Sequence, residues 1–502
     1  MWKLVAGLVA FRVFNALFVR TYFNPDEFWQ SSEVAHHMVF GYGYLTWEWQ
    51  PHAQLRGYAH PSMFALLYKA LQLLNLDTAW TVAYGPRILQ GIVTVVTDVF
   101  LYKLARTYFD GAAAKYALLC QLASWFIFFA LSRTFSNSIE TCCTTIALRY
   151  WPWHFLTGES KRRDDLVESS SMTTKQQTRK AFAFAALGCI FRPTNAVLWV
   201  FLTATLVVQT KSKLALLLHT IVPVGVLAIS LMLVVDRIGY GEWTCVPWNF
   251  VKFNVLEGKD KLYGVHPWYW YFVAGYPEIT ATHLPLILFG GFLTQKRELA
   301  AVIVWGLCVF SLGAHKEPRF LLPLLPASFV YAGKALLYLE KRTFFKPLLG
   351  LLILLNGIAA VYFARFHQRA PLEVMDYLVA TVHPTDSVDF LVPCHATPFY
   401  SHLHQNISLW FPSCTPSERE AGSPSDALRQ DPLAFATARY KSHPLPTYIV
   451  VYSSGASALH NSLAIWKFAL QKQFDHSTLS LDADSPVADT HMLVYSNQMI
   501  SP

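Results

Sequence analysis

The sequence predicts a polytopic α-helical membrane protein that ends in a small α/β domain. Hydrophobic residues make up 54% of the 502 residues and charged residues only 14%, whereas soluble globular chains carry about 25% charged residues. Apolar segments recur as far as residue 364 and then stop. The net charge of +8 is modest, and its basic clusters lie in short loops. That pattern is typical of membrane topology and lipid head groups, not of nucleic-acid binding.

The apolar segments define a membrane domain over residues 1–365. A spanning helix needs about 20 mostly apolar residues, and the candidates predict roughly 10 to 13 spans. The segment 2–20 lacks a small-residue cleavage site, so we expect it to stay as an anchor. The candidate segments are 2–20, 59–76, 87–106, 113–131, 134–156, 181–209, 213–236, 277–294, 298–314, 318–339 and 346–364.

The segment 181–209 is interrupted by Arg192-Pro193. It is either one kinked span or a pair of short helices, because proline removes a backbone donor and clashes with the preceding turn. A pair would place the basic cluster 161–163 and Lys211 on the same side, as the positive-inside rule requires. Asp98 and Asp236 are candidate partners for the Arg192 side chain.

Three stretches lie outside the spans: a loop at 21–58, a second loop at 237–276, and the tail 366–502. We expect all three to lie on the non-cytosolic, lumenal side of the membrane. In the tail, Ser387–Val392, Tyr448–Tyr452 and Met492–Tyr495 are β-type runs separated by Pro, Ser and Asp residues. A helical stretch around Ser462–Gln471 completes the predicted α/β domain. The stretch Ser417–Asp431 predicts a flexible loop.

The loop 21–58 holds the candidate catalytic carboxylates. Asp26 and Glu27 follow Asn24-Pro25, and carboxylates favour the first turn of a helix for structural reasons alone. The alternative is a general base that removes a proton from a sugar hydroxyl, with a pKa raised by burial near the bilayer. Glu33 and His37, one helical turn apart, extend this polar face toward a substrate. Two tryptophans, Trp47 and Trp49, are candidates to stack on sugar rings.

A second group of ionisable residues, His315, Lys316, Glu317 and Arg319, lies between two apolar segments. Charged groups at a membrane boundary are costly, so a functional site is the default hypothesis, although interfacial snorkelling also explains them. Lysine and arginine here suit the phosphate of a lipid-linked donor. Weaker candidates, which interfacial packing explains equally well, are Arg56 for the phosphate and His266 and Trp268 for the substrate.

The tail holds Cys394 and Cys414, with histidines nearby. Their spacing matches no paired zinc-ligand pattern. A Cys394–Cys414 disulfide is the better hypothesis if the tail lies in an oxidising compartment. Asn406-Ile407-Ser408 is a glycosylation sequon that fits the same side of the membrane.

Several motifs together resemble glycosyltransferase family 22, and most closely its members that act on the precursor of the glycosylphosphatidylinositol (GPI) anchor. In chain order they are NPDEFWQSSEVAHHMVFGYGYLTWEW, LRGYAHP, FRPTNAV, NFVKFNVLEG, YGVHPWYWYFVAGYP and AHKEPRFLLPLLP. The resemblance covers roughly residues 1–365.

The resemblance implies a GT-C membrane fold in the endoplasmic reticulum with a lumenal active site. It implies an inverting, metal-independent mannosyltransferase that uses dolichyl-phosphate-mannose as donor. The acceptor would be mannosylated glucosaminyl-phosphatidylinositol, which receives the third, α1,2-linked mannose. The acidic residue that the family places in its first lumenal loop corresponds to Asp26, with Glu27 beside it. The family's HKE-x-RF element corresponds to His315, Lys316, Glu317 and Arg319.

Three alternatives stay open. Other family members add a fourth GPI mannose, or α1,2 or α1,6 mannoses of the dolichol-linked N-glycan precursor; PDEFWQ with TWEW favours the third-mannose enzymes. A transporter or flippase predicts ionisable residues along the spans and inverted repeats, whereas the charges here concentrate in loops. A non-catalytic scaffold subunit would tolerate the loss of both Asp26 and Glu27.

Overall fold

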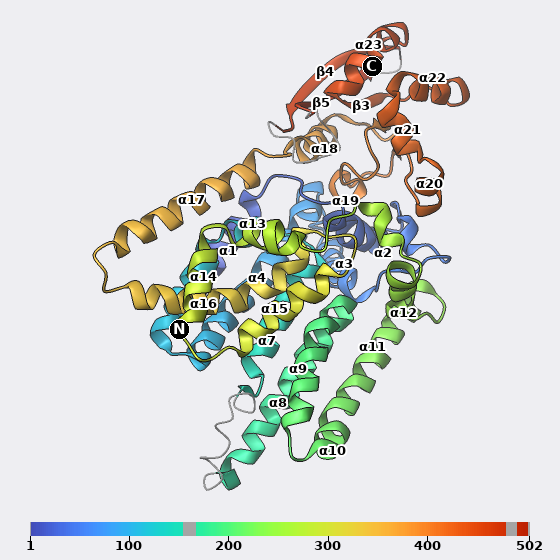
Figure 1. The fold of residues 1–502 in the computed structure, drawn as a ribbon. Helices are drawn as coiled ribbons and strands as arrows, with labels where there is room; N and C mark the ends of the chain where they lie inside the picture. The colour runs from blue at the N-terminus through green and yellow to red at the C-terminus, as the bar shows by residue number, and fades with distance from the viewer. Residues whose placement is uncertain (1, 154–166, 478–488, 500–502) are drawn as a thin grey trace. The chain divides into compact units, whose positions relative to one another are not determined.

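The computed structural model describes residues 2–153, 167–477 and 489–499 (Figure 1). The basic cluster 161–163 therefore lies outside the described residues. The chain forms two compact units: residues 1–16, 54–60 and 87–360 make the first, and residues 17–53, 61–86 and 361–502 make the second. This division differs from a single boundary at residue 365, because the opening loop groups with the C-terminal part of the chain.

The first unit is helical. Its elements include α5 (Gly111–Ala123), α6 (Trp125–Ala130), α7 (Ser136–Tyr150), α8 (Val167–Phe191), α9 (Ala196–Gln209), α10 (Lys213–Leu216), α11 (Val222–Tyr240), α12 (Val246–Val251), α13 (Tyr276–Thr280), α14 (Leu284–Phe292), α15 (Glu298–Ser311) and α16 (Leu325–Leu339). Helices α1 (Trp2–Phe18), α3 (Ala59–Leu73), α4 (Ala79–Tyr108) and α17 (Phe345–Arg365) continue from one unit into the other.

Among the described residues, four helical segments are long and apolar enough to cross a membrane: Ala79–Tyr108, Lys213–Tyr240, Pro318–Leu339 and Phe345–Arg365. Pro193–Gln209 and Glu298–Ser311 are shorter apolar helices. The expected span 113–131 is divided, because Ser124 leaves the helical conformation and caps α6 through its hydroxyl. The predicted number of spans stays a prediction.

Close helix packing in this unit depends on small residues. A Cβ atom on Gly290 of α14 would lie 1.9 Å from the carbonyl oxygen of Tyr331 in α16. A Cβ atom on Gly333 of α16 would lie 2.5 Å from the backbone nitrogen of Ala117 in α5. Glycine at both contacts lets the backbones approach, which is how helices associate where apolar burial gives no driving force between them.

The chain reverses direction at Arg192-Pro193. Arg192 is extended (φ −150°, ψ 107°), and a 3-10 turn, Pro193–Asn195, leads into α9. The Asn195 side chain lies 2.6 Å from the position of a Cβ atom on Gly188, which two turns of continuous helix would not allow. Figure 1 shows the first turns of α8 and the short helix α10 at the same end of this unit. The two-helix alternative for 181–209 is therefore confirmed.

Several buried ionisable groups of the first unit have an ionic or hydrogen-bond partner. Arg12 of α1 donates to Asp98 of α4 at 2.7 and 2.8 Å, and both side chains are fully buried. Asp236 accepts the Tyr58 backbone N–H at 2.8 Å. The expected partners of Arg192 were wrong, because Arg192 instead pairs with Glu140 of α7, at 3.4 Å.

The second unit contains a five-stranded mixed sheet in the order β2-β1-β3-β5-β4. Strand β1 pairs in parallel with β2 and β3, and β5 pairs antiparallel with β3 and β4. Helix α2 (Glu33–Phe40) belongs to the opening loop. The C-terminal elements are α18 (Ala370–Thr381), β1 (Ser387–Leu391), α19 (Tyr400–Leu403), β2 (Ser408–Trp410), α20 (Pro416–Ala421), α21 (Pro424–Gln430), α22 (Pro432–Ser442), β3 (Tyr448–Tyr452), α23 (Ser453–Ile465), β4 (Phe468–Asp475) and β5 (His491–Asn497).

The three predicted strands of the tail are confirmed, and two other expectations there were wrong. The predicted helix Ser462–Gln471 ends at Ile465, and Phe468–Asp475 is a strand because it pairs along its length with β5. The predicted flexible loop Ser417–Asp431 forms α20 and α21. Each of these helices begins with a capping box, Thr415 with Glu418 and Ser423 with Asp426.

The two faces of the sheet have separate cores. Along β3, Tyr448 and Val450 face one core and Ile449 and Val451 the other, as the alternation of a strand requires. The first of these cores contains α18 and three aromatic residues of the opening loop: Tyr22, Phe28 and Trp29. These aromatic side chains explain why the opening loop belongs to the second unit.

Candidate active site

The two predicted groups of site residues lie in different units. The second unit contains the predicted site residues of the opening loop, from Asp26 to Trp49. The first unit contains the group His315–Arg319.

Asp26 lies at the start of the opening helix and is partly exposed. Its backbone N–H donates to the Asn24 Oδ1 atom at 3.0 Å, so Asn24 caps the helix that Pro25 introduces. Glu27 is fully buried. The helix continues through a π-helical turn, Phe28–Ser32, into α2, and π-helical turns are frequent at functional sites. Asp26 is therefore the more accessible carboxylate of the pair.

Glu33 is fully buried and holds a distant segment of the tail. Its Oε1 atom accepts hydrogen bonds from the Phe399 N–H (2.7 Å), the Ser401 N–H (3.1 Å) and the Ser401 hydroxyl (2.6 Å). Burial raises the pKa of Glu33 to about 6, and these hydrogen bonds limit the rise. In this geometry Glu33 joins the opening helix to α19. Its predicted contact with a substrate stays a prediction.

Three histidines, His36, His37 and His404, belong to the same unit as Glu33. His36 and His404 lie 3.0 Å apart between Nε2 and Nδ1, and burial together with the neighbouring imidazole lowers the pKa of His36 to about 3. The Nδ1 atom of His37, a predicted substrate contact, is buried and has no hydrogen-bond partner within the described residues.

The two predicted sugar-stacking tryptophans differ in exposure. Trp49 is only 3% exposed and donates from Nε1 to the Trp29 carbonyl at 3.3 Å, so it packs in the second unit. Trp47 is half-buried, and its stacking on a sugar ring stays a prediction.

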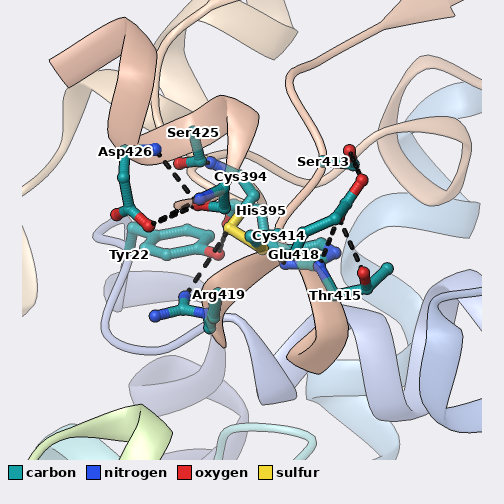
Figure 2. The surroundings of a disulfide bond; sticks show 11 residues. Tyr22, Cys394, His395, Ser413, Cys414, Thr415, Glu418, Arg419, Ser425 and Asp426 are labelled. Carbon is teal, nitrogen blue, oxygen red and sulfur yellow. Dashed lines mark hydrogen bonds between the residues drawn. A yellow bond between two sulfur atoms is a disulfide. The ribbon is translucent and has the colours of Figure 1, made fainter. Parts of the chain in front are cut away.

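The Cys394–Cys414 disulfide is confirmed, with Cα atoms 6.1 Å apart (Figure 2). Figure 2 shows Tyr22 and Arg419 beside it, and the Tyr22 hydroxyl donates to the His395 carbonyl. Cys394, His395 and Cys414 also form a close group of metal-ligand types. Because both sulfur atoms are bonded to each other, they are not thiolate ligands. The sequon residue Asn406 is exposed.

In the first unit, one carboxylate organises the His315–Arg319 group. Glu317 accepts from Arg319 Nε at 2.6 Å and Arg319 Nη2 at 2.7 Å, and it contacts His315 Nε2 at 3.0 Å. Burial acts to raise the pKa of Glu317, but Arg319 and His315 hold that pKa well below its usual range. Burial likewise opposes protonation of His315, yet Glu317 raises the pKa of this imidazole above its usual value. Lys316 and Arg319 carry two positive charges against the one carboxylate of Glu317, so the group is positive even with a neutral His315.

Lys316 is buried and tied to the main chain. Its Nζ atom donates to the His266 carbonyl at 3.0 Å and to the Gly313 carbonyl at 2.5 Å. Burial lowers the pKa of Lys316, and nearby Asp260 opposes this shift. His266 therefore contributes its backbone to the group. Its imidazole stacks on Trp270, with ring centroids 4.5 Å apart.

Two weaker candidates lie nearer the surface. Trp268 is 70% exposed. Arg56 is half-buried, and its carbonyl accepts the Tyr240 hydroxyl at 2.7 Å.

A buried polar network of Arg192, Glu140 and Asn195 adjoins the His315–Arg319 group, and the sequence did not predict it. Arg192 and Arg319 both lie near the Phe320 ring, at 5.1 and 5.4 Å from its centroid. Glu140, the partner of Arg192, also accepts from Asn195 at 2.9 Å. In the sequence, a carboxylate in an apolar segment marks Glu140 as unusual. Nothing near it in the chain indicates that its partners are Arg192 and Asn195 of the FRPTN motif.

The fold is of the GT-C type. Over 99% of the chain the fold matches ArnT from Cupriavidus metallidurans bound to undecaprenyl phosphate, with a TM-score of 0.62, 12% identity and 97% of that chain covered. The oligosaccharyltransferase of Archaeoglobus fulgidus matches over 92% of this chain and 70% of its own, with a TM-score of 0.50 and 12% identity.

Residues 3–404 match the Alg9-like mannosyltransferase family. The chain belongs to this family and is a membrane-bound mannosyltransferase. It is 38% identical to "Mannosyltransferase APTG1" of Arabidopsis thaliana over 95% of this chain and 89% of the relative. It is 39% identical to the human "GPI alpha-1,2-mannosyltransferase 3" over 89% of this chain and 78% of the relative.

Proposed function

We propose that this enzyme transfers the third, α1,2-linked mannose from dolichyl-phosphate-mannose to the GPI-anchor precursor in the lumen of the endoplasmic reticulum. The observation that carries the acceptor is its 36–39% identity, over most of the chain, to relatives from several animals named GPI alpha-1,2-mannosyltransferase 3. The disulfide and the exposed sequon support a lumenal second unit, because that compartment is oxidising.

Asp26 is the proposed general base. It takes the proton from the 2-hydroxyl of the acceptor's terminal mannose, and that oxygen attacks the anomeric carbon of the donor. The bond from this carbon to the dolichyl phosphate oxygen breaks with inversion. The partial exposure of Asp26, against the full burial of Glu27, supports this assignment. A positioned base contributes roughly 10²–10⁴-fold to the rate.

The departing phosphate is assigned to the positive group in the first unit. Arg319 and His315 are oriented by Glu317, and Lys316 adds a third cation held beside them. Such a preorganised positive charge stabilises the charge that develops on a leaving phosphate. Arg56 is a further candidate for the same phosphate, and Trp47 for sugar stacking.

The test is Asp26→Asn, with Glu27→Gln as the matched variant. Each is expressed in cells that lack the endogenous enzyme, and surface GPI proteins and lipid intermediates are measured. We expect Asp26→Asn to lower transfer at least about 10²-fold with unchanged expression and melting temperature, and a two-mannose intermediate to accumulate. Normal transfer by Asp26→Asn, with loss of transfer by a folded Glu27→Gln, would move the base to Glu27.

Two further readouts separate the alternatives. Accumulation of a three-mannose GPI intermediate, or of a truncated dolichol-linked N-glycan precursor, would assign the enzyme to another acceptor in the same family.

We expect transfer to persist in a chelator, since the proposed chemistry uses no metal, and loss of activity that a divalent cation restores would contradict this.

A further inference from the structure

The loop that follows α11 exposes an unusual amount of apolar surface. From Trp243 to Val273 it is built of short helical turns, including α12 and the π-helical turn Lys252–Leu256. Seven of its large apolar side chains are more than half exposed: Trp243, Trp248, Val255, Leu256, Val265, Trp268 and Val273. Large exposed apolar patches mark interaction surfaces.

The surface is continuous with a membrane-facing helix. The segment Lys213–Tyr240 is apolar enough to span a bilayer and is little buried within the protein. Its outward residues include Leu227 (70% exposed) and Ile238 (78% exposed). The chain turns at Gly241, which has a positive φ of 76°, and Trp243 lies two residues further on. The apolar face of the loop therefore begins where the lipid-facing surface of α11 ends.

The composition of the loop fits the bilayer interface. Its exposed tryptophans, Trp243, Trp248 and Trp268, flank a stretch with lysines, of which Lys252 and Lys261 are exposed. Tryptophan concentrates at the head-group level of membranes, and segments with lysines beside aromatic residues lie in the plane of that interface.

The same loop holds the His315–Arg319 group. The Asp260 carboxylate accepts the backbone N–H groups of Ala314 and His315 at 3.0 and 3.3 Å. The His266 N–H donates to the Ala314 carbonyl at 3.1 Å, and the Tyr271 hydroxyl bonds to the Glu317 backbone at 3.1 Å. The depth of the loop in a membrane therefore sets the depth of the cationic group.

We propose that residues 241–273 lie in the head-group interface of the bilayer and hold the His315–Arg319 group at the depth of lipid phosphates. The placement in the bilayer stands without the proposed reaction. Its consequence, that the loop presents the cations to a membrane-borne donor, rests on the proposed function.

The placement is tested with Cys245, an exposed free cysteine inside the loop. A variant with Cys189→Ser and Cys308→Ser is labelled there with an environment-sensitive NBD dye and reconstituted in phosphatidylcholine vesicles with spin-labelled lipids. Two reference proteins also carry Cys245→Ser and are labelled at a new cysteine instead. The dye at Leu227→Cys reports a deep position in the bilayer, and the dye at Gln473→Cys reports the aqueous phase. We expect stronger quenching at Cys245 by shallow than by deep spin labels. Emission equal to that at Gln473→Cys would overturn the placement.

The consequence is tested kinetically with the double variant Trp248→Glu, Leu256→Glu. For donor in vesicles we expect the KM to rise several-fold with kcat little changed, while a short-chain, water-soluble donor analogue keeps its KM. Ile465→Glu, at an exposed apolar position of the tail, is the control and should change neither. Equal losses with both donors, or no change with either, would overturn the presenting role. Activity of the unmodified enzyme with both donors is measured first, so that failure of the proposed function is recognised separately.

Discussion

Replacing Glu33 by alanine should lower the free energy of unfolding of the second unit. Three donors, two from backbone and one from Ser401, converge on its Oε1 atom. Alanine would leave these buried donors without an acceptor, at about 1–3 kcal/mol each. Removing the carboxylate also relieves the cost of its buried charge. With a pKa of about 6 instead of 4.5, that cost is about 2 kcal/mol near neutral pH.

Loss of the three hydrogen bonds outweighs relief of the buried charge, so the free energy of unfolding should fall by about 4 kcal/mol. For a unit of about 200 residues that corresponds to a fall of about 10 °C in melting temperature. Glu33→Gln keeps an oxygen acceptor and removes the charge, so it should melt close to the unsubstituted protein at pH 7.

The pH dependence distinguishes these variants. The folded-state pKa of Glu33 is raised, so the folded protein binds more protons than the unfolded chain between about pH 4.5 and 6. The contribution of this group to stability therefore falls as the pH rises through that interval and is then constant. Glu33→Gln should lack this slope.

The assay is thermal unfolding in detergent followed by tryptophan fluorescence, with transfer activity measured on the same samples. Glu48→Ala is the control, because Glu48 accepts from Gln30 at 3.1 Å at a less buried position. A melting temperature of Glu33→Ala within about 2 °C of that of the unsubstituted protein, well inside the expected shift, would show that Glu33 is not an anchor. Loss of transfer by Glu33→Gln at an unchanged melting temperature would instead place Glu33 on the substrate.

Three further predictions concern the disulfide and the two buried ionic groups. Joint replacement of Cys394 and Cys414 by serine should cost about 3 kcal/mol, because the bridge closes a loop over a sequence separation of 20; reduction of the unsubstituted protein should lower its melting temperature to match. Arg192→Met should cost about 3–5 kcal/mol because the Glu140 carboxylate stays buried without its cation, and adding Glu140→Gln should recover part of this loss in a double-mutant cycle. The raised pKa of His315 means that its contribution to stability is complete below about pH 6.5 and declines as the pH rises through the folded-state pKa; His315→Gln should remove that decline in melting curves from pH 6 to 9.

Features that depend on neighbours in the chain could be predicted from the sequence. Apolar segments of sufficient length, the strands of the tail, and the pairing of the only two tail cysteines follow from local composition. The joint arrangement of His315, Glu317 and Arg319 was also accessible, because residues two apart in an extended turn contact one another directly. The capping boxes of α20 and α21 are local signals of the same kind, because each helix start is set by residues three apart in the sequence.

The tertiary structure decided which segments meet, and with that the role of individual charges. Glu33 is a polar residue one helical turn before His37 in the sequence; only its contact with Ser401, 368 residues away, makes it an anchor. The partner of Arg192 and the attachment of the second loop to the His315–Arg319 group were likewise decided by contacts between distant segments. The physical reason is that transfer of apolar side chains out of water depends on local composition, whereas the partner of a buried charge depends on which of several compatible segments the packing brings beside it.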